Sequence, residues 1–146
     1  MAHAGMSQSA VVSAYFNRLD RGDPTLMDLF ADDLQLWFPK FGIGIGKEAF
    51  GAFAAGILPT LGSIEHFVDP DAFIIAGDRV VVEGTTRGEM KNGVQWAGGE
   101  TPGGRFCNVF EIRDGLIARL FIYLDPDYAG ADSDRFLWPE RGAGPW

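Results

Sequence analysis

Apolar residues recur at helical spacing in the first third of the chain. In residues 9–19 they lie three and four positions apart, which predicts a helix with one buried face formed by Ala10, Val11, Val12, Tyr15, Phe16 and Leu19. The run Arg21-Gly22-Asp23-Pro24 ends this helix, because Gly suits a helix C-terminus and Pro suits the first turn of the next helix. Similar spacing predicts a short second helix over residues 25–30 and a third over residues 47–58.

The pattern changes to strands after Pro59. A short strand is predicted at residues 34–38, and further strands at residues 64–68, 72–75, 79–90, 105–112 and 116–124. Gly77-Asp78 and Asp114-Gly115 are typical of hairpin turns. Because helices come first and strands second, the order predicts an α+β domain with an antiparallel or mixed sheet.

Two glycine-rich segments interrupt these elements. Residues 40–46 are expected to form a flexible loop, and no Lys-Ser or Lys-Thr pair follows them as a phosphate-binding loop requires. Residues 98–104 connect two strands and are a candidate lid. The tail keeps several aromatic residues, so we expect it to dock on the pocket mouth or on a second subunit: Tyr128, Phe136, Trp138 and Trp146.

Length and charge limit the class of protein. The 146 residues fit one domain, residues 1–146, with a core at about 9–127 and a C-terminal tail at 128–146. A net charge of −8 and the lack of a basic patch argue against nucleic acid and anionic membranes as partners. The chain has neither an apolar run of the roughly 20 residues that a membrane helix needs nor a secretory signal pattern.

Cysteine and histidine are scarce. The single Cys107 cannot form an internal disulfide, which is typical of a protein in the reducing cytoplasm. His3 and His66 lack a metal-binding spacing, so no metal site is expected, and no cofactor is expected either.

Several short segments occur in an order and spacing that are specific for one fold. They cover residues 15–23, 29–33, 46–50, 77–83, 104–117 and 123–125. Together they resemble the nuclear-transport-factor-2-like superfamily over roughly residues 9–127, and are closest to its SnoaL-like polyketide-cyclase branch, with ketosteroid isomerases and limonene-epoxide hydrolases as cousins. The resemblance implies a cone-shaped fold in which three N-terminal helices pack on a curved antiparallel or mixed sheet, a deep apolar cavity, and usually a homodimer.

The cousins' catalytic patterns are only partly present. Against the ketosteroid isomerase pattern, the oxyanion-hole tyrosine matches Tyr15, but the general base falls at Phe38 and the oxyanion-hole aspartic acid at Asn108. A phenylalanine cannot take a proton, whereas Asn108 can still donate a hydrogen bond. Two of the three positions differ, which argues against steroid isomerisation by that mechanism.

The limonene-epoxide hydrolase pattern is also broken. Its arginine and first aspartate fall near Gly84 and Thr86, and only its last aspartate is matched, by Asp125. The resemblance therefore argues against epoxide hydrolysis by that triad.

Strand alternation indicates which side chains face the cavity. If Asn108 points inward, Phe106, Phe110 and Ile112 do so as well. We expect an apolar pocket with the catalytic candidates Asp125, Tyr15, His66 and Asn108, of which Asp125 is the preferred acid or base. Candidate substrate-binding residues are Trp37, Phe38, Phe53, Trp96, Arg105, Phe110, Phe121 and Tyr123.

Each candidate also has a purely structural interpretation. Asp125 precedes Pro126 and is typical of a residue that caps a strand end. Tyr15, Asn108 and His66 are also typical of core or surface residues whose polar groups are satisfied, and Arg105 of a solvated strand start.

The sequence favours a cofactor-independent enzyme that performs acid–base chemistry on a small hydrophobic, oxygenated molecule, aromatic or polyketide-like. The expected reaction class is isomerisation, aldol-type cyclisation or its reverse, or dehydration. Two alternatives from other classes remain: a non-catalytic binder of an apolar ligand, and a dimeric protein-interaction module whose sheet face binds a partner.

Overall fold

The N-terminal helices begin and end where the sequence supplies caps. In the computed structural model, which describes residues 6–136, 138 and 146, helix α1 spans Gln8–Asp20 and the Ser7 hydroxyl accepts a hydrogen bond from the Ala10 amide at 3.1 Å. The expected second helix is a 3₁₀ helix, η1 (Pro24–Leu29), capped by the Asp23 carboxylate on the Thr25 amide at 2.9 Å. Helix α2 (Lys47–Ile57) matches the expected third helix.

The expectation of a flexible loop at residues 40–46 is wrong. Strand β1 (Phe30–Phe38) turns at Lys40 and pairs with β2 (Gly42–Ile45) in an antiparallel hairpin. Lys40 and Gly42 have positive φ values of 74° and 75°, so this turn uses a glycine where the backbone is left-handed. Apolar Ile43 and Ile45 alternate with glycines along β2, and the pairing with β1 makes a strand of this short run.

The later strands follow the predicted order with two changes. They are β3 (Leu61–Phe67), β4 (Ile74–Ala76), β5 (Arg79–Met90), β7 (Arg105–Arg113) and β8 (Leu116–Leu124), with a short 3₁₀ helix, η2 (Pro70–Ala72), before β4 and another, η3 (Ser133–Arg135), in the tail. The strand expected at residues 72–75 starts later because η2 occupies its beginning, and a short strand, β6 (Gln95–Ala97), was not predicted. The glycine-containing hairpin turns at Gly77 and Gly115, both with positive φ, are confirmed.

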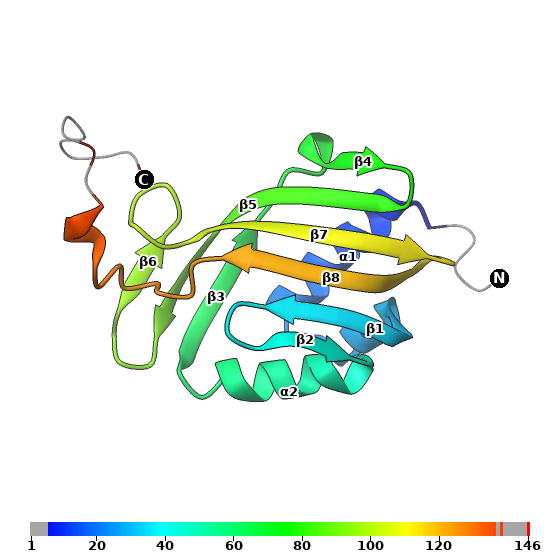
Figure 1. Cartoon of the computed structure of the whole chain (residues 1–146), viewed down its shortest axis with the longest axis horizontal. Helices are drawn as coiled ribbons and strands as arrows, with labels where there is room; N and C mark the ends of the chain where they lie inside the picture. Colours follow the sequence, from blue (N-terminus) through cyan, green and yellow to red (C-terminus); the bar gives the residue numbers. More distant parts are fainter. Residues whose placement is uncertain (1–5, 137, 139–145) are drawn as a thin grey trace.

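The strands form one mixed sheet. Its strand order is β2-β1-β8-β7-β5-β3, with β4 and β6 also paired to β5; β1 and β8 are parallel and the other pairs are antiparallel. The two halves of β5 have different partners, because residues 79–85 pair with β7 and residues 85–90 pair with β3. Figure 1 shows β3 running steeply across the direction of β7 and β8, so the sheet is strongly curved.

The core lies between the helices and the inner face of this sheet. In Figure 1, α1 crosses behind the strands while α2 lies along the β1–β2 hairpin, so the face toward the viewer carries no described helix. Buried Val11, Val12 and Phe16 of α1 pack with Val80, Val82 and Phe110 of the sheet in one hydrophobic cluster. No helix among the described residues is long and apolar enough to span a membrane.

Candidate functional site

A cavity of about 160 Å³ lies between the helices and the inner sheet face. Side chains from α1, α2, β1, β3, β5, β7, β8 and the tail line it, and most of them are apolar. Its aromatic wall is formed by Phe38, Phe50, Phe53 and Phe106. Its polar groups are Tyr15, His66, Thr86, Asn108 and Tyr128.

His66 is fixed by a carboxylate from the end of α1. Its Nδ1 lies 2.6 Å from Asp20 Oδ1, and its backbone amide donates to Asp20 Oδ2 at 2.8 Å. Because a carboxylate only accepts, Nδ1 carries the proton and the neutral ring has its lone pair at Nε2. The described residues provide no hydrogen-bond partner for Nε2. The pair therefore supplies an oriented base at the cavity wall.

Asn108 has a buried and unsatisfied amide. The residue is 3% exposed, and its Oδ1 is the one buried side-chain polar atom of the described residues that lacks a hydrogen-bond partner. Leaving such an atom unpaired costs about 1–3 kcal/mol. Since Asn108 lines the cavity, a ligand that donates a hydrogen bond, such as a hydroxyl, can supply the partner that Oδ1 lacks.

Tyr15 lies in the densest part of the aromatic cluster. It is 1% exposed, and its ring contacts Phe110 at a centroid distance of 5.3 Å and Phe16 at 5.0 Å. Burial, with a smaller contribution from the charge of Asp20, raises the pKa of Tyr15 above its ordinary value. The hydroxyl therefore stays protonated and can act as a hydrogen-bond donor at neutral pH.

A hydrogen-bonded wall closes one side of the cavity. The Trp96 indole donates to Thr86 Oγ1 at 2.9 Å, and its ring stacks on Tyr128 at a centroid distance of 4.3 Å. Tyr128 belongs to the tail, so one tail aromatic closes the cavity of its own chain. Phe136 and Trp138 are 66% and 79% exposed.

The glycine-rich candidate lid is joined to the same wall. The Gly98 amide donates to the Thr86 carbonyl at 2.9 Å, and the Thr86 amide donates to the Gly104 carbonyl at 2.7 Å. Both ends of the segment are therefore hydrogen bonded to β5.

Five sequence-predicted residues line the cavity: Tyr15, Phe38, Phe53, His66 and Asn108. The expected position of Asp125 in the pocket is wrong. Asp125 is exposed, and its Oδ1 accepts from the Asp127 amide at 2.9 Å, as a turn residue does.

Three aromatic candidates lie on the outer face of the sheet, and their expected place in the pocket is also wrong. Asn108 pairs with Ile122, and residues paired across strands share a face, so Ile122 and Leu124 point inward while Phe121 and Tyr123 point outward. Trp37 packs on Tyr123 at a centroid distance of 5.1 Å and shares that outer face.

Phe110, Trp96 and Arg105 also do not line the cavity. Phe110 is fully buried beneath Tyr15, and Trp96 supports Thr86 from behind the wall. Arg105 is exposed and donates from Nε to the Trp146 carbonyl at 2.5 Å, rather than meeting a ligand.

Sequence reasoning missed Asp20 and Tyr128. Asp20 ends a predicted helix and is 46 residues from His66, so only the packing of β3 on α1 shows the pair. Tyr128 was noted only as a tail aromatic. His3 lies outside the described residues.

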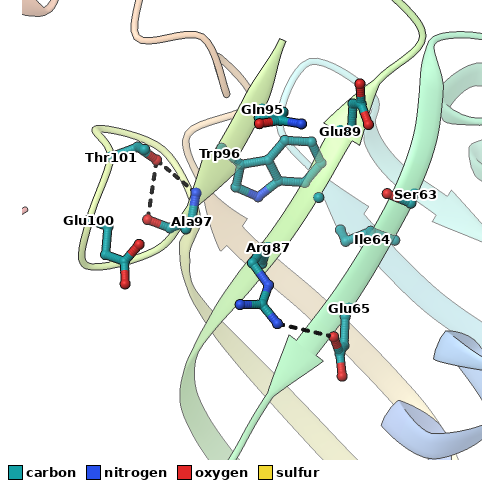
Figure 2. A pocket seen from close by; sticks show the side chains of 11 residues that line it. Ser63, Ile64, Glu65, Arg87, Glu89, Gln95, Trp96, Ala97, Glu100 and Thr101 are labelled. Atoms are coloured by element: carbon teal, nitrogen blue, oxygen red, sulfur yellow. Dashed lines mark hydrogen bonds and ion pairs between the residues drawn. The ribbon is translucent and has the colours of Figure 1, made fainter. Parts of the chain in front are cut away.

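A second hollow, lined by strands β3, β5 and β6, is open and polar (Figure 2). Arg87 Nη2 lies 3.8 Å from Glu65 Oε1, and both side chains are more than half exposed, so the pair contributes little. The described residues contain no group of three His, Cys, Asp or Glu that fits a metal ion. The aromatic cavity is therefore the candidate site.

Comparison with solved structures shows the same fold. An NTF2-like protein of unknown function from Burkholderia pseudomallei is 22% identical, with a TM-score of 0.71 over 82% of this chain and 92% of that one. A proposed polyketide cyclase from Pseudomonas putida is 21% identical, with a TM-score of 0.67 over 85% and 96%. A limonene-epoxide-hydrolase-like epoxide hydrolase from M. tuberculosis is 20% identical, with a TM-score of 0.65 over 84% and 85%.

These identities support a common fold and leave the reaction open. None of the curated proteins matches the chain. The family model described as a SnoaL-like domain matches residues 12–120, which is most of the described chain. The match includes α1 from Val12 onward and all the strands that build the cavity except the last residues of β8. The chain belongs to the SnoaL-like domain family.

Proposed function

We propose that this protein is a cofactor-independent enzyme that performs general acid–base chemistry on a small hydrophobic, oxygenated molecule. The observation that carries the proposal is the Asp20–His66 pair at the wall of an apolar cavity that also contains the unpaired amide of Asn108. An oriented imidazole is a suitable base near neutral pH. Tyr15 and Asn108 supply donors for an oxyanion.

The proposed first step is proton abstraction next to a carbonyl. His66 Nε2 takes the proton from carbon, the C–H electron pair forms a carbon–carbon double bond, and the carbonyl π pair moves to oxygen. The oxyanion then accepts hydrogen bonds from the Tyr15 hydroxyl and from Asn108 Nδ2. Asp20 stabilises the imidazolium that forms.

Three outcomes can follow from this enolate. Return of the proton to another carbon gives an isomer. Departure of a β-hydroxyl as water, with the proton from His66, gives a dehydration product. Attack of the enolate carbon on a second carbonyl of the same molecule forms a ring, the π pair of that carbonyl moves to its oxygen, and the oxygen takes the proton from His66; the reverse cleaves a ring. The apolar lining suits all three, because it excludes water from the enolate.

The proposal is tested by a mass-spectrometric screen in D₂O with aromatic and polyketide-like hydroxy-ketones. Loss of water indicates dehydration, and release of a fragment indicates cleavage. Deuterium uptake at constant composition indicates isomerisation or ring formation. His66→Gln should lower turnover by roughly 10²- to 10⁴-fold, the range for a general base. Asp20→Asn should lower kcat by roughly 10- to 100-fold with little change in KM, because Asp20 positions the base and does not touch the substrate.

Asp28→Asn is the matched control, since Asp28 is an exposed carboxylate that does not line the aromatic cavity. Unchanged turnover in both His66→Gln and Asp20→Asn would contradict the proposal. Ligand binding with no turnover across the panel would favour the non-catalytic binder instead.

We also propose that the protein pairs with a second copy of itself through the outer sheet face. This face, formed by strands β2, β1, β8, β7, β5 and β4, carries an apolar set: Ile43, Ile45, Trp37, Phe121, Tyr123, Val109, Val81 and Ile74. Its central strands also carry three arginines and two glutamates: Arg79, Arg105, Arg119, Glu83 and Glu111. Because the chain as a whole has a charge of −8, a face whose central strands carry no excess of negative charge is where two copies approach with least repulsion.

The free thiol of Cys107, the only cysteine, is consistent with a reducing compartment, and we propose the cytoplasm as the location of the protein.

A further inference from the structure

The size of the aromatic cavity limits the substrate. A protein cavity of about 150 Å³ lined by apolar side chains takes up one benzene molecule. The cavity described above has a volume of about 160 Å³, so its interior accommodates one six-membered ring with small substituents. A fused system of three or four rings would require Phe53, Phe106 and neighbouring side chains to move.

The charge of the cavity limits the substrate further. Among the described residues that line it there is no lysine or arginine, and the carboxylate of Asp20 lies behind His66. An anionic substrate would lose its hydration without gaining a counter-ion, at a cost of several kcal/mol. The arginine expected to meet an anion, Arg105, lies outside the cavity. An uncharged substrate meets neither penalty.

Three of the polar residues of the cavity, His66, Asn108 and Tyr15, lie at successive inward positions of β7 or against them. The His66 ring contacts the Phe106 ring at 5.5 Å, and the Tyr15 ring contacts the Phe110 ring at 5.3 Å. Asn108 lies between these two phenylalanines on the strand. Residues two apart on a strand are about 6.5 Å apart, which is close to the span of a substituted six-membered ring. One small ring can therefore present polar groups to Asn108 and to a neighbouring polar side chain at the same time.

We propose that the substrate is an uncharged single-ring molecule that carries a carbonyl and a hydroxyl on neighbouring positions. Its ring packs among the phenylalanines, its hydroxyl donates to the unpaired Asn108 Oδ1, its carbonyl accepts from Asn108 Nδ2 and the Tyr15 hydroxyl, and its acidic hydrogen faces His66. This assignment rests on the proposed acid–base function, because His66 is given the role of base.

The test is a calorimetric titration of the whole protein with four probes at pH 7.5. 2′-Hydroxyacetophenone, with the hydroxyl on the ring, is the uncharged single-ring ketone, 1-hydroxy-2-acetonaphthone adds a ring, 1-hydroxyanthraquinone adds two, and 2-hydroxybenzoate replaces the methyl ketone by a carboxylate. The single-ring ketone should bind at least about tenfold more tightly than each of the other three, a difference of about 1.4 kcal/mol. Tighter binding of the anion or of the three-ring ketone would overturn the assignment, and so would failure of the single-ring ketone to bind.

Two variants check that binding occurs in this cavity. Phe53→Leu removes a ring from the wall and should improve binding of the two-ring ketone relative to the single-ring ketone. Phe67→Leu changes an exposed ring that does not line the cavity and should leave the ratio unchanged. Equal effects of both variants would contradict the assignment.

NMR detection of the exchange of the acetyl hydrogens for deuterium tests the acid–base function independently of the substrate class. Tight binding of 2′-hydroxyacetophenone without exchange dependent on His66 would support the substrate class and contradict the acid–base function. Exchange dependent on His66 on the two-ring ketone alone would support the acid–base function and contradict the substrate class.

Discussion

Asp20 links the two polar ends of the cavity. Its carboxylate binds both the ring and the backbone amide of His66, and its charge contributes to the raised pKa of Tyr15. One side chain at the end of α1 therefore orients the proposed base and disfavours ionisation of the proposed donor. Replacing Asp20 affects both groups, whereas replacing Tyr15 affects only one.

The raised pKa of Tyr15 predicts a specific alkaline behaviour. In the unfolded chain this phenol ionises near pH 10, but in the folded protein it keeps its proton to higher pH. The contribution of Tyr15 to the free energy of unfolding is therefore complete below about pH 10 and is lost as the pH rises above that value. Tyr15→Phe should remove this loss, so its unfolding midpoint in denaturant should fall less between pH 9 and pH 11.

Absorbance at 295 nm provides the second measurement. Burial also raises the pKa of Tyr128, so two of the three tyrosines should ionise late. Tyr15→Phe should remove the later part of the tyrosinate signal. Loss of a signal centred near pH 10 instead would show that Tyr15 is solvated.

The residues that the sequence predicted correctly are those whose neighbours repeat the same pattern. Tyr15 lies on the apolar stripe of α1 and Asn108 alternates with inward phenylalanines on β7, so their faces follow from spacing alone. Asp125 lies just beyond the end of a strand, where alternation no longer fixes direction and the following Pro126 favours a turn. The Asp20–His66 pair depends on tertiary packing that no local pattern contains.

In strand β8, one charged residue is enough to predict which side chains face outward. Arg119, Phe121 and Tyr123 have the same parity, and the Arg119 guanidinium lies 3.7 Å from the centre of the Phe121 ring. An arginine in the middle of a strand marks the outer face, because burying its charge is costly. The aromatic side chains of β8 suggested that Phe121 and Tyr123 line the pocket. That inference fails because aromatic residues are common on both faces of this sheet.

Other elements depended on partners rather than on their own residues. The four-residue strand β2 and the three-residue strand β6 are too short to show a pattern, and both form by pairing with longer strands, β1 and β5. By contrast, the bounds of β5 and β8 follow directly from their β-branched and aromatic residues and from the glycine turns that precede them.

Replacing two glycines by alanine should have opposite effects on stability. Gly51 lies in the exposed side of α2, and a Cβ there would meet nothing within 4 Å, so Gly51→Ala should raise the free energy of unfolding by about 0.4–1 kcal/mol. Gly88 lies where β5 meets β3 and β6, and a Cβ there would lie 2.5 Å from the Trp96 ring and closer still to the Ser63 carbonyl. Gly88→Ala should therefore lower the free energy of unfolding by about 1–3 kcal/mol.

Urea unfolding of the two variants beside the parent protein checks this pair. Destabilisation by Gly51→Ala would mean that the exposed face of α2 is covered in solution. A neutral Gly88→Ala would mean that β6 and Trp96 can move away from β5 at little cost.

At the scale of the whole molecule, charge and apolar surface are unevenly distributed. The cavity face is closed by α1, α2 and the tail, whereas the outer sheet face carries apolar side chains such as Ile43 at 59% and Ile74 at 58% exposure. An apolar face of this extent on an acidic molecule is typical of an interaction surface. The mixture of arginines and glutamates within it favours a second copy over a strongly charged partner.

Sedimentation equilibrium tests this pairing. The protein should sediment at twice its chain mass of 15.9 kDa, and Ile43→Glu, which adds two carboxylates to a twofold interface, should raise the dissociation constant at least about tenfold. Ile75→Glu is the matched control, because Ile75 is also exposed but lies on the opposite face of β4 from Ile74. Added salt should strengthen the parent dimer, since it screens the repulsion between two bodies of charge −8 and does not weaken apolar contacts. A monomeric parent protein would contradict the proposed dimer. Equal effects of the two variants would show that β2 is not part of the interface.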